Sequence, residues 1–452
     1  MKNIFICLCV FFKNSCLFAA IFITLVLVSE NHKMLSQIKT KLSSDFIKHI
    51  FTVFSGNVIA QAIPFLCEPI LTRIYTPEDF AVLSVYLSVA NLFSIIATAR
   101  YEMAIMLPKE DRKAMNVLGL SLIISLIVSV LSFIIVWVFN TSICKILNNE
   151  DVSNYLYLVP LSVLSVSWYQ VFNYWNSRKK RFRNVAISKS VESITKVTAN
   201  IALSFLKSLG LVLGQITGYL TSVVVLCFSF FRRDRHQLTI INKQEMKEMA
   251  ITYQDFPKVN SVQAFGDVLK QSGEIFLLSC YYLKEQVGLY SRTLRLLFSP
   301  SVIIGSAVAQ VFYQKASETY HKTGDIRKLS IKVLIALACI SLPFYTVVFF
   351  WGEDLFAWFL GENYRIAGIY GKYLVPYLFF RFITSPVSQI PLIANKQKKA
   401  LLLSWLGHAL YLFAIILGGV KGDILLGFTF LSIFVSIYYI GLIAWFLKIA
   451  KL

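Results

Sequence analysis

Polar side chains recur at helical spacing within one apolar segment, residues 259–280. Gln263, Asp267, Lys270 and Glu274 are separated by four, three and four positions, so a helix carries all of them on one face. Ionisable side chains are costly inside a membrane unless they face a bundle interior or a wet cavity. The stripe therefore predicts a polar interior that can bind ions or charged cargo.

Two other apolar segments repeat this pattern. Segment 185–206 carries Lys189, Glu192, Lys196 and Asn200 at steps of three, four and four. Segment 49–72 carries Asn57, Gln61, Pro64 and Glu68. The bundle interior thus receives polar faces from several helices. Local pairing of Lys270 with Glu274, or of Lys189 with Glu192, is the alternative to a functional role.

Three arginines lie in apolar segments with no acidic residue within a helical turn. Arg292 and Arg295 begin segment 288–312, and Arg381 lies between Pro376 and Pro386. A guanidinium group presents a planar fork of donors that matches phosphate or carboxylate oxygens. Each arginine is expected to bind either cargo or a carboxylate on another helix.

These residues define two candidate sets. Basic residues outnumber acidic ones inside the segments, which favours an anionic ligand. The predicted cargo-binding residues are Arg292, Arg295, Arg381, Lys270, Lys189 and Lys196, and the predicted ion-coupling residues are Glu68, Asp267 and Glu274. The five histidines are scattered and no Cys-x-x-Cys occurs, so neither a metal site nor a cofactor is expected.

The elements that position these residues follow from composition. Of 452 residues, 57% are hydrophobic and 15% charged, which is typical of a polytopic membrane protein. The net charge is +20, and the basic residues lie between long apolar runs. Membrane topology accounts for this distribution, so no nucleic-acid partner is expected. Seven of the eight cysteines lie in apolar runs and Cys144 is expected in a polar loop, so no disulfide framework is predicted.

A window of roughly 20 apolar residues predicts an all-α chain with twelve transmembrane helices. Their ranges are 49–72, 80–99, 115–139, 152–175, 185–206, 210–231, 259–280, 288–312, 329–350, 366–390, 400–420 and 424–447. The longest polar connection, 232–258, is too short for a catalytic domain. Pro and Gly recur inside these ranges, as neighbouring helices permit.

Loop charge predicts the orientation. The even-numbered connections and the two ends of the core carry 27 Lys and Arg, whereas the odd-numbered connections carry six. Basic residues concentrate in cytoplasmic loops of membrane proteins. Both ends of the twelve-helix core are therefore predicted to face the cytoplasm.

The predicted domains are a six-helix bundle at 34–231, a cytoplasmic linker at 232–258 and a second six-helix bundle at 259–452. Residues 1–33 form an apolar extension that would add a thirteenth helix. No clean small-x-small cleavage site follows it, and Met34 is the favoured natural start, with an N-terminal anchor or signal sequence as the alternative.

An internal repeat relates the two halves. Residues 75–84 align with 282–291 at a constant offset of 207 positions, with identical Tyr, Glu and Ser at three of them. Six helices per half keep both copies in one orientation, which predicts parallel repeats related by an axis along the membrane normal. The alternative is that both stretches are merely interfacial turns.

An aromatic run precedes the most basic connection. Tyr169, Phe172, Tyr174 and Trp175 lie before the cluster 178–183. The arrangement is typical of an interfacial anchor that meets anionic head groups.

Longer stretches carry a family resemblance. FSGNVIAQAIPFLCEPILTRIYTPEDFAVLSVYLS, IATARYEMAIMLP and VGLYSRTLRLLFSPSVIIGSAVAQVFYQKASE resemble the polysaccharide biosynthesis proteins, the Wzx-type O-antigen flippases. The likeness covers about 45–330 and extends over the last four helices in hydropathy only. This group is related to the drug-exporting MATE antiporters and to the lipid II flippase.

The resemblance implies two six-helix bundles forming a V, alternating access, and an undecaprenyl-pyrophosphate-linked oligosaccharide as cargo. It implies a bacterial inner-membrane location, contact with membrane lipids, and a polysaccharide polymerase and chain-length regulator as partners. Basic residues of a central cavity are the expected cargo contacts, and no catalytic residues carry over.

Two other functions remain as alternatives. A cation-coupled multidrug antiporter of the MATE type could use the acidic interior residues, although its cargo is usually cationic. An O-antigen polymerase or ligase needs a large outward loop, and every predicted outward loop has about fifteen residues or fewer.

Overall fold

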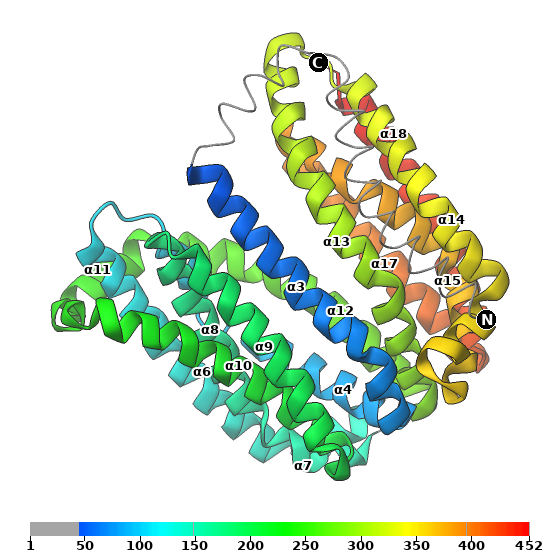
Figure 1. The fold of residues 1–452 in the computed structure, drawn as a ribbon, viewed down its shortest axis with the longest axis horizontal. Coiled ribbons are helices and arrows are strands. Elements are labelled where there is room, and N and C mark those ends of the chain that lie inside the picture. The colour runs from blue at the N-terminus through cyan, green and yellow to red at the C-terminus, as the bar shows by residue number, and fades with distance from the viewer. Residues whose placement is uncertain (1–44, 148, 395, 452) are drawn as a thin grey trace. The chain divides into compact units, whose positions relative to one another are not determined.

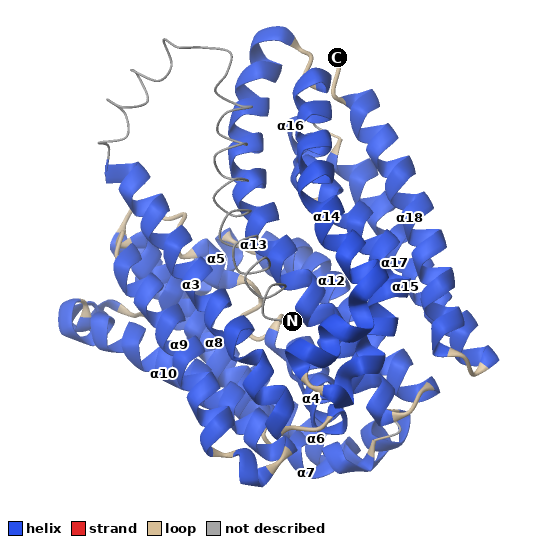
Figure 2. Ribbon diagram, turned by 45° about the vertical axis from the view of Figure 1, so that its right-hand side comes forward, coloured by secondary structure: helices blue, strands red, loops and turns tan. Residues whose placement is uncertain are grey.

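The computed structural model describes residues 45–147, 149–394 and 396–451, and these residues form helices joined by short connections (Figure 2). The predictions for the segment 1–33 and for Met34 lie outside the described residues. Within the described residues no strand occurs, and one isolated bridge joins Asp325 to Lys451. The all-α prediction is confirmed.

Each range predicted to span the membrane contains a helix (Figure 1), although in 80–99 the helix ends at Ser94 and turns follow. In the first part of the chain they are α3 (Asp45–Ile74), α4 (Pro77–Ser94), α5 (Tyr101–Ala104), α6 (Asp111–Ile146), α7 (Ser153–Leu156), α8 (Val159–Arg178), α9 (Phe182–Ala202), α10 (Ser208–Arg233), α11 (Lys243–Thr252) and α12 (Ser261–Tyr281). In the second part they are α13 (Lys284–Thr323), α14 (Arg327–Leu360), α15 (Arg365–Thr384), α16 (Ile390–Ile393), α17 (Gln397–Lys421) and α18 (Ile424–Ile449). A π-helix at Phe256–Asn260 leads into α12.

Several of these helices are long and apolar enough to cross a membrane. Among the described residues five meet that test by themselves: α6, α10, α14, α17 and α18. A sixth span arises if the bent pair formed by Glu150–Leu156 and Val159–Arg178, with 55° between its parts, is taken as one. The chain is therefore a multi-pass membrane protein, and the number twelve stays a prediction.

The chain separates into two compact units. One comprises His49–Arg292 with Phe359–Tyr364, and the other contains Thr293–Trp358 and Arg365–Leu452 among its residues. We refer to them as the N-terminal and C-terminal units. The predicted bundle boundaries, 34–231 and 259–452, remain predictions.

Glycines let two helices of the N-terminal unit approach closely. A Cβ at Gly214 of α10 would lie 1.8 Å from the side-chain oxygen of Asn200 on α9, and a Cβ at Gly218 would lie 3.0 Å from the Cβ of Lys196. Small residues at such spacing are common where membrane helices pack. The polar face of α9 therefore lies partly against α10.

An apolar core fills one end of the N-terminal unit. Trp175 and Phe172 of α8 pack edge-on against Phe230 of α10, with ring centroids 5.9 and 5.5 Å apart. Met115 of α6 and Met249 of α11 are buried in the same cluster. Through Met249 the linker helix α11 is part of the folded core.

The two stretches that align in sequence, 75–84 and 282–291, meet inside the N-terminal unit. Thr76 caps α4 in a reciprocal capping box with Asp79. A Cβ at Gly288 in α13 would lie 1.7 Å from the carbonyl oxygen of Pro77, so only glycine fits without a backbone shift. The start of α13 is thereby packed on the start of α4.

In the C-terminal unit α18 packs against both α15 and α17. The backbones of α14 and α15 approach closely, since a Cβ at Gly368 would lie 2.3 Å from the carbonyl oxygen of Gly352. A backbone bond from Ile326 to Ala450, 2.8 Å long, ties the beginning of α14 to the end of α18.

One expectation about α6 was wrong. Cys144 does not lie in a polar loop but is buried in α6, which continues to Ile146 rather than ending near 139. Asn140 sustains this extension, because its amide donates to the Ser153 carbonyl at 3.0 Å and its carbonyl accepts from the Ser153 hydroxyl at 2.8 Å.

Candidate functional site

A buried ion pair joins residues from two of the predicted sets. Arg292 of α13 donates from Nη1 to Oε1 of Glu68 on α3 at 2.6 Å, and the two side chains are 7% and 3% exposed. The guanidinium carbon lies 4.0 Å above the ring centre of Phe80. Arg292 was expected to meet cargo or a cross-helix partner, and the structure provides the partner.

A second network surrounds Glu274 of α12. Its Oε1 accepts a hydrogen bond from the hydroxyl of Tyr290, and its Oε2 lies 3.4 Å from the ammonium of Lys270. Tyr290 is fully buried and Glu274 nearly so. Ser272 on the same helix donates to the Ser88 carbonyl of α4 at 2.9 Å, which fixes α12 in place.

The residues of the predicted polar stripe of α12 differ in how far they are buried. Gln263 and Asp267 are exposed, Lys270 is half-buried and Glu274 is buried. The stripe therefore does not act as one uniform face. The local pairing of Lys270 with Glu274, an alternative left open by the sequence, is present.

The polar residues of α9 lie against two neighbouring helices, with Lys189, Glu192 and Lys196 half-buried and Asn200 buried. Ser193 donates to the Ala60 carbonyl of α3 at 2.6 Å. On the other side the α10 glycines adjoin Glu192, Lys196 and Asn200. Lys196 thus lies against α10, as expected for a polar membrane residue, and Lys189 is half-buried.

Arg381 of α15 occupies a different environment in the C-terminal unit. Its Nη1 donates to the hydroxyl of Tyr377 at 2.6 Å, and its guanidinium carbon lies 4.1 Å from the ring centre of Phe298. Tyr377 in turn stands near the rings of Tyr411 and Tyr439, at 5.7 and 6.4 Å. Among the described residues no carboxylate forms an ion pair with Arg381, and it is half-buried.

Arg295 is also half-buried, one turn beyond Arg292 on α13. The division between units falls just after Arg292. The structure brings Glu68 together with Arg292, and Glu274 with Lys270, within the N-terminal unit. Arg295 and Arg381 belong to the C-terminal unit.

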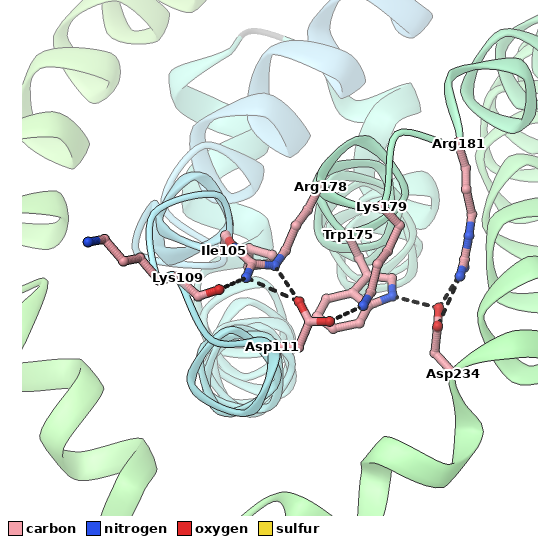
Figure 3. A network of polar contacts seen from close by, with 8 residues as sticks. All are labelled: Ile105, Lys109, Asp111, Trp175, Arg178, Lys179, Arg181 and Asp234. Carbon is pink, nitrogen blue, oxygen red and sulfur yellow. Dashed lines mark hydrogen bonds and ion pairs between the residues drawn. The ribbon is translucent and has the colours of Figure 1, made fainter.

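Several polar residues were missed by the sequence analysis. Asp111 and Asp234 organise the basic connections, as Figure 3 shows, and Asn116 binds the linker. The isolated acid among the arginines of 232–235 was the available signal for Asp234. No sequence signal pointed to Tyr290, because a single tyrosine in an apolar helix is usually a core residue.

A strained turn containing a buried acid was also missed. Ala99 and Arg100 have φ of 49° and 62°, a conformation that costs residues with a Cβ about 1–2 kcal/mol. Glu102, fully buried, accepts from the Thr98 hydroxyl and lies 3.5 Å from Arg100. These residues stand in the quoted stretch IATARYEMAIMLP, whose spacing gave no sign of the turn.

This chain has long apolar helices and buried charges that pair with each other. It is therefore a multi-pass membrane protein with polar residues in its interior. The chain belongs to a family described as polysaccharide biosynthesis protein, whose model matches residues 70–367. No curated protein matches it.

Solved structures share its fold. The lipid II flippase MurJ in an inward closed conformation aligns with a TM-score of 0.67 and 14% identity, covering 89% of this chain and 90% of that one. An inward-facing multidrug resistance MATE family transporter of the MOP superfamily aligns with a TM-score of 0.63 and 13% identity, covering 87% and 96%. An outward-facing MATE family transporter aligns at 0.59 and 14%, covering 91% and 98%.

Proposed function

We propose that this protein moves an undecaprenyl-pyrophosphate-linked oligosaccharide, the repeat unit of an O-antigen or similar surface polysaccharide, across the bacterial inner membrane by alternating access. The family assignment supports a role in polysaccharide biosynthesis. The fold shared with a lipid II flippase supports movement of a lipid-linked sugar.

The observation that carries the proposal is the environment of Arg381. A half-buried guanidinium with a tyrosine hydroxyl and an aromatic ring as its described contacts retains donors for an anionic group. In a partly desolvated site such charge-assisted bonds are stronger than in water. The pyrophosphate or an acidic sugar of the cargo supplies the missing negative charge, with Arg295, Lys189 and Lys196 as further cargo contacts.

The paired residues have a different role in this proposal. Arg292 with Glu68, and Lys270 with Glu274, hold helices together in one state and can exchange partners in another. Glu274 and Glu68 are the proposed coupling acids, with Asp267 as an exposed third. In this scheme the two predicted bundles, 34–231 and 259–452, move in alternating access. Both core ends face the cytoplasm, and a polymerase and chain-length regulator receive the cargo.

A reconstituted assay tests the proposal. Proteoliposomes containing the purified protein and a fluorescent lipid-pyrophosphate-linked oligosaccharide should show sugar that becomes accessible to a membrane-impermeant lectin, compared with protein-free vesicles. Efflux of a cationic dye measured in the same vesicles tests the multidrug-antiporter alternative. Dye transport without oligosaccharide movement would refute the flippase proposal.

A further inference from the structure

Two carboxylates at one end of the N-terminal unit neutralise part of its most basic connection (Figure 3). Asp111 at the start of α6 accepts from Arg178 at 3.1 Å and binds the ammonium of Lys179. Asp234, just beyond α10, accepts from both terminal nitrogens of Arg181, at 2.5 and 2.9 Å, and from the indole of Trp175 at 2.9 Å. The carboxylates of Asp111 and Asp234 are thus already paired and do not neutralise other cations.

Five further cations lie within two residues of Arg181 or Asp234 in the sequence. They are all exposed, and within the described residues none of them forms an ion pair with a carboxylate: Lys180, Arg183, Arg232, Arg233 and Arg235. We call these five residues the basic patch. They keep five positive charges in one small region.

The Asp234 contacts hold the basic patch together. Asp234 is 4% exposed and bridges the turn between α8 and α9 to the end of α10. Lys180 and Arg183 flank Arg181 in sequence, and Arg233 and Arg235 flank Asp234. The bidentate bond therefore places both groups of cations on a common surface.

The basic patch lies at the end of a membrane-crossing helix. Helix α10 is one of the apolar spans and ends at Arg233. Phe228 and Phe231 in its last turns are 66% and 53% exposed, as expected of side chains that face lipid. Cations that follow such a span by one or two residues stand at the level of the lipid head groups.

We propose that the basic patch binds the phosphate groups of anionic membrane lipids. Several arginines allow bidentate contacts with phosphate oxygens, and the adjacent phenylalanines contact the acyl chains. Of the anchor predicted at 178–183, only Lys180 and Arg183 belong to the basic patch. Arg178, Lys179 and Arg181 form ion pairs with carboxylates. The proposal rests on the membrane location and does not depend on the cargo.

Binding of fluorescent phosphatidylglycerol to the full-length protein in mixed micelles tests this. The variant R232Q/R233Q/R235Q should bind at least about tenfold more weakly than wild type in low salt, since each surface cation adds attraction to an anionic lipid. The matched control K145Q/K207Q/K421Q removes three exposed cations from other helix ends and should bind like wild type. Raising the salt concentration should abolish the difference, because it screens exposed charges.

A thermal melt of each variant shows whether it is folded, and K180Q/R183Q provides a second test if the triple variant is unstable. Wild-type protein that binds phosphatidylcholine as well as phosphatidylglycerol would overturn the proposal, and an acidic protein surface would then be the better partner. Equal loss of binding in the control variant would also overturn it.

Discussion

Arg292 on α13 and Glu68 on α3, 224 positions apart in the chain, form a buried ion pair at 2.6 Å. The pair ties the beginning of α13 to α3 within the N-terminal unit, beside the contact between Gly288 and Pro77. The pair can serve as a fixed structural link or as a charge pair that exchanges partners during transport. Mutations distinguish these two roles.

Removal of one partner of the pair should destabilise the protein. R292A leaves the Glu68 carboxylate buried without its cation, a change that costs about 3–5 kcal/mol in known cases. Thermal melts and the amount of membrane-inserted protein should both fall, and E68Q/R292Q should recover part of the loss. An R292A protein with wild-type stability that fails to export polysaccharide would instead favour a direct cargo role.

Variants of the Glu274 network show whether its acids only balance the charge of Lys270 or also couple transport to an ion. If Asp267 and Glu274 only balance Lys270, the triple variant D267N/K270Q/E274Q should regain export that K270Q or E274Q alone lose. In that case D267N alone should have a small effect, because Asp267 is exposed. A triple variant that inserts normally yet stays inactive would indicate that at least one of the acids couples transport to an ion.

The contact between the two aligned stretches, 75–84 and 282–291, can be tested at Gly288. G288A places a methyl group 1.7 Å from the Pro77 carbonyl oxygen, so the backbone must shift. Overpacking of this kind costs about 1–3 kcal/mol. G273A is the matched control, because its Cβ would meet nothing within 4 Å. If both variants melt at the wild-type temperature, the two stretches do not pack as described.

Asp234 should make stability depend on pH. Burial by itself would raise the pKa of Asp234, but hydrogen bonds from Arg181 and Trp175 outweigh it and hold the pKa below its ordinary value. The stabilisation is therefore fully present above the unfolded-state pKa of about 3.9 and is lost as pH falls through the folded value. D234N should melt well below wild type at pH 7 and converge with it in acid.

The exposed residue Asp255 supplies the comparison for that experiment. D255N should follow the wild-type melting curve at every pH, because Asp255 is exposed. A constant gap between D234N and wild type down to the lowest pH would show that Asp234 acts by packing rather than by charge.

Helix positions were predictable from sequence because long apolar runs leave few alternatives to helices in a membrane. Partners were harder to predict. Lys270 and Glu274 are one turn apart, so their pairing was foreseen, whereas Glu68 and Arg292 meet only through the fold. Cys144 was misplaced because Asn140 and Ser153 extend α6 through contacts that hydropathy does not register.

Export of surface polysaccharide per membrane-inserted molecule, compared for R381A and R381K, shows whether Arg381 binds the cargo. If Arg381 binds the anionic group of the cargo, R381A should reduce export at least about tenfold at a near wild-type protein level, and R381K should restore it only in part, because an ammonium lacks the bidentate geometry. Unchanged export in R381A, or a loss explained entirely by less inserted protein, would show that Arg381 does not bind the cargo.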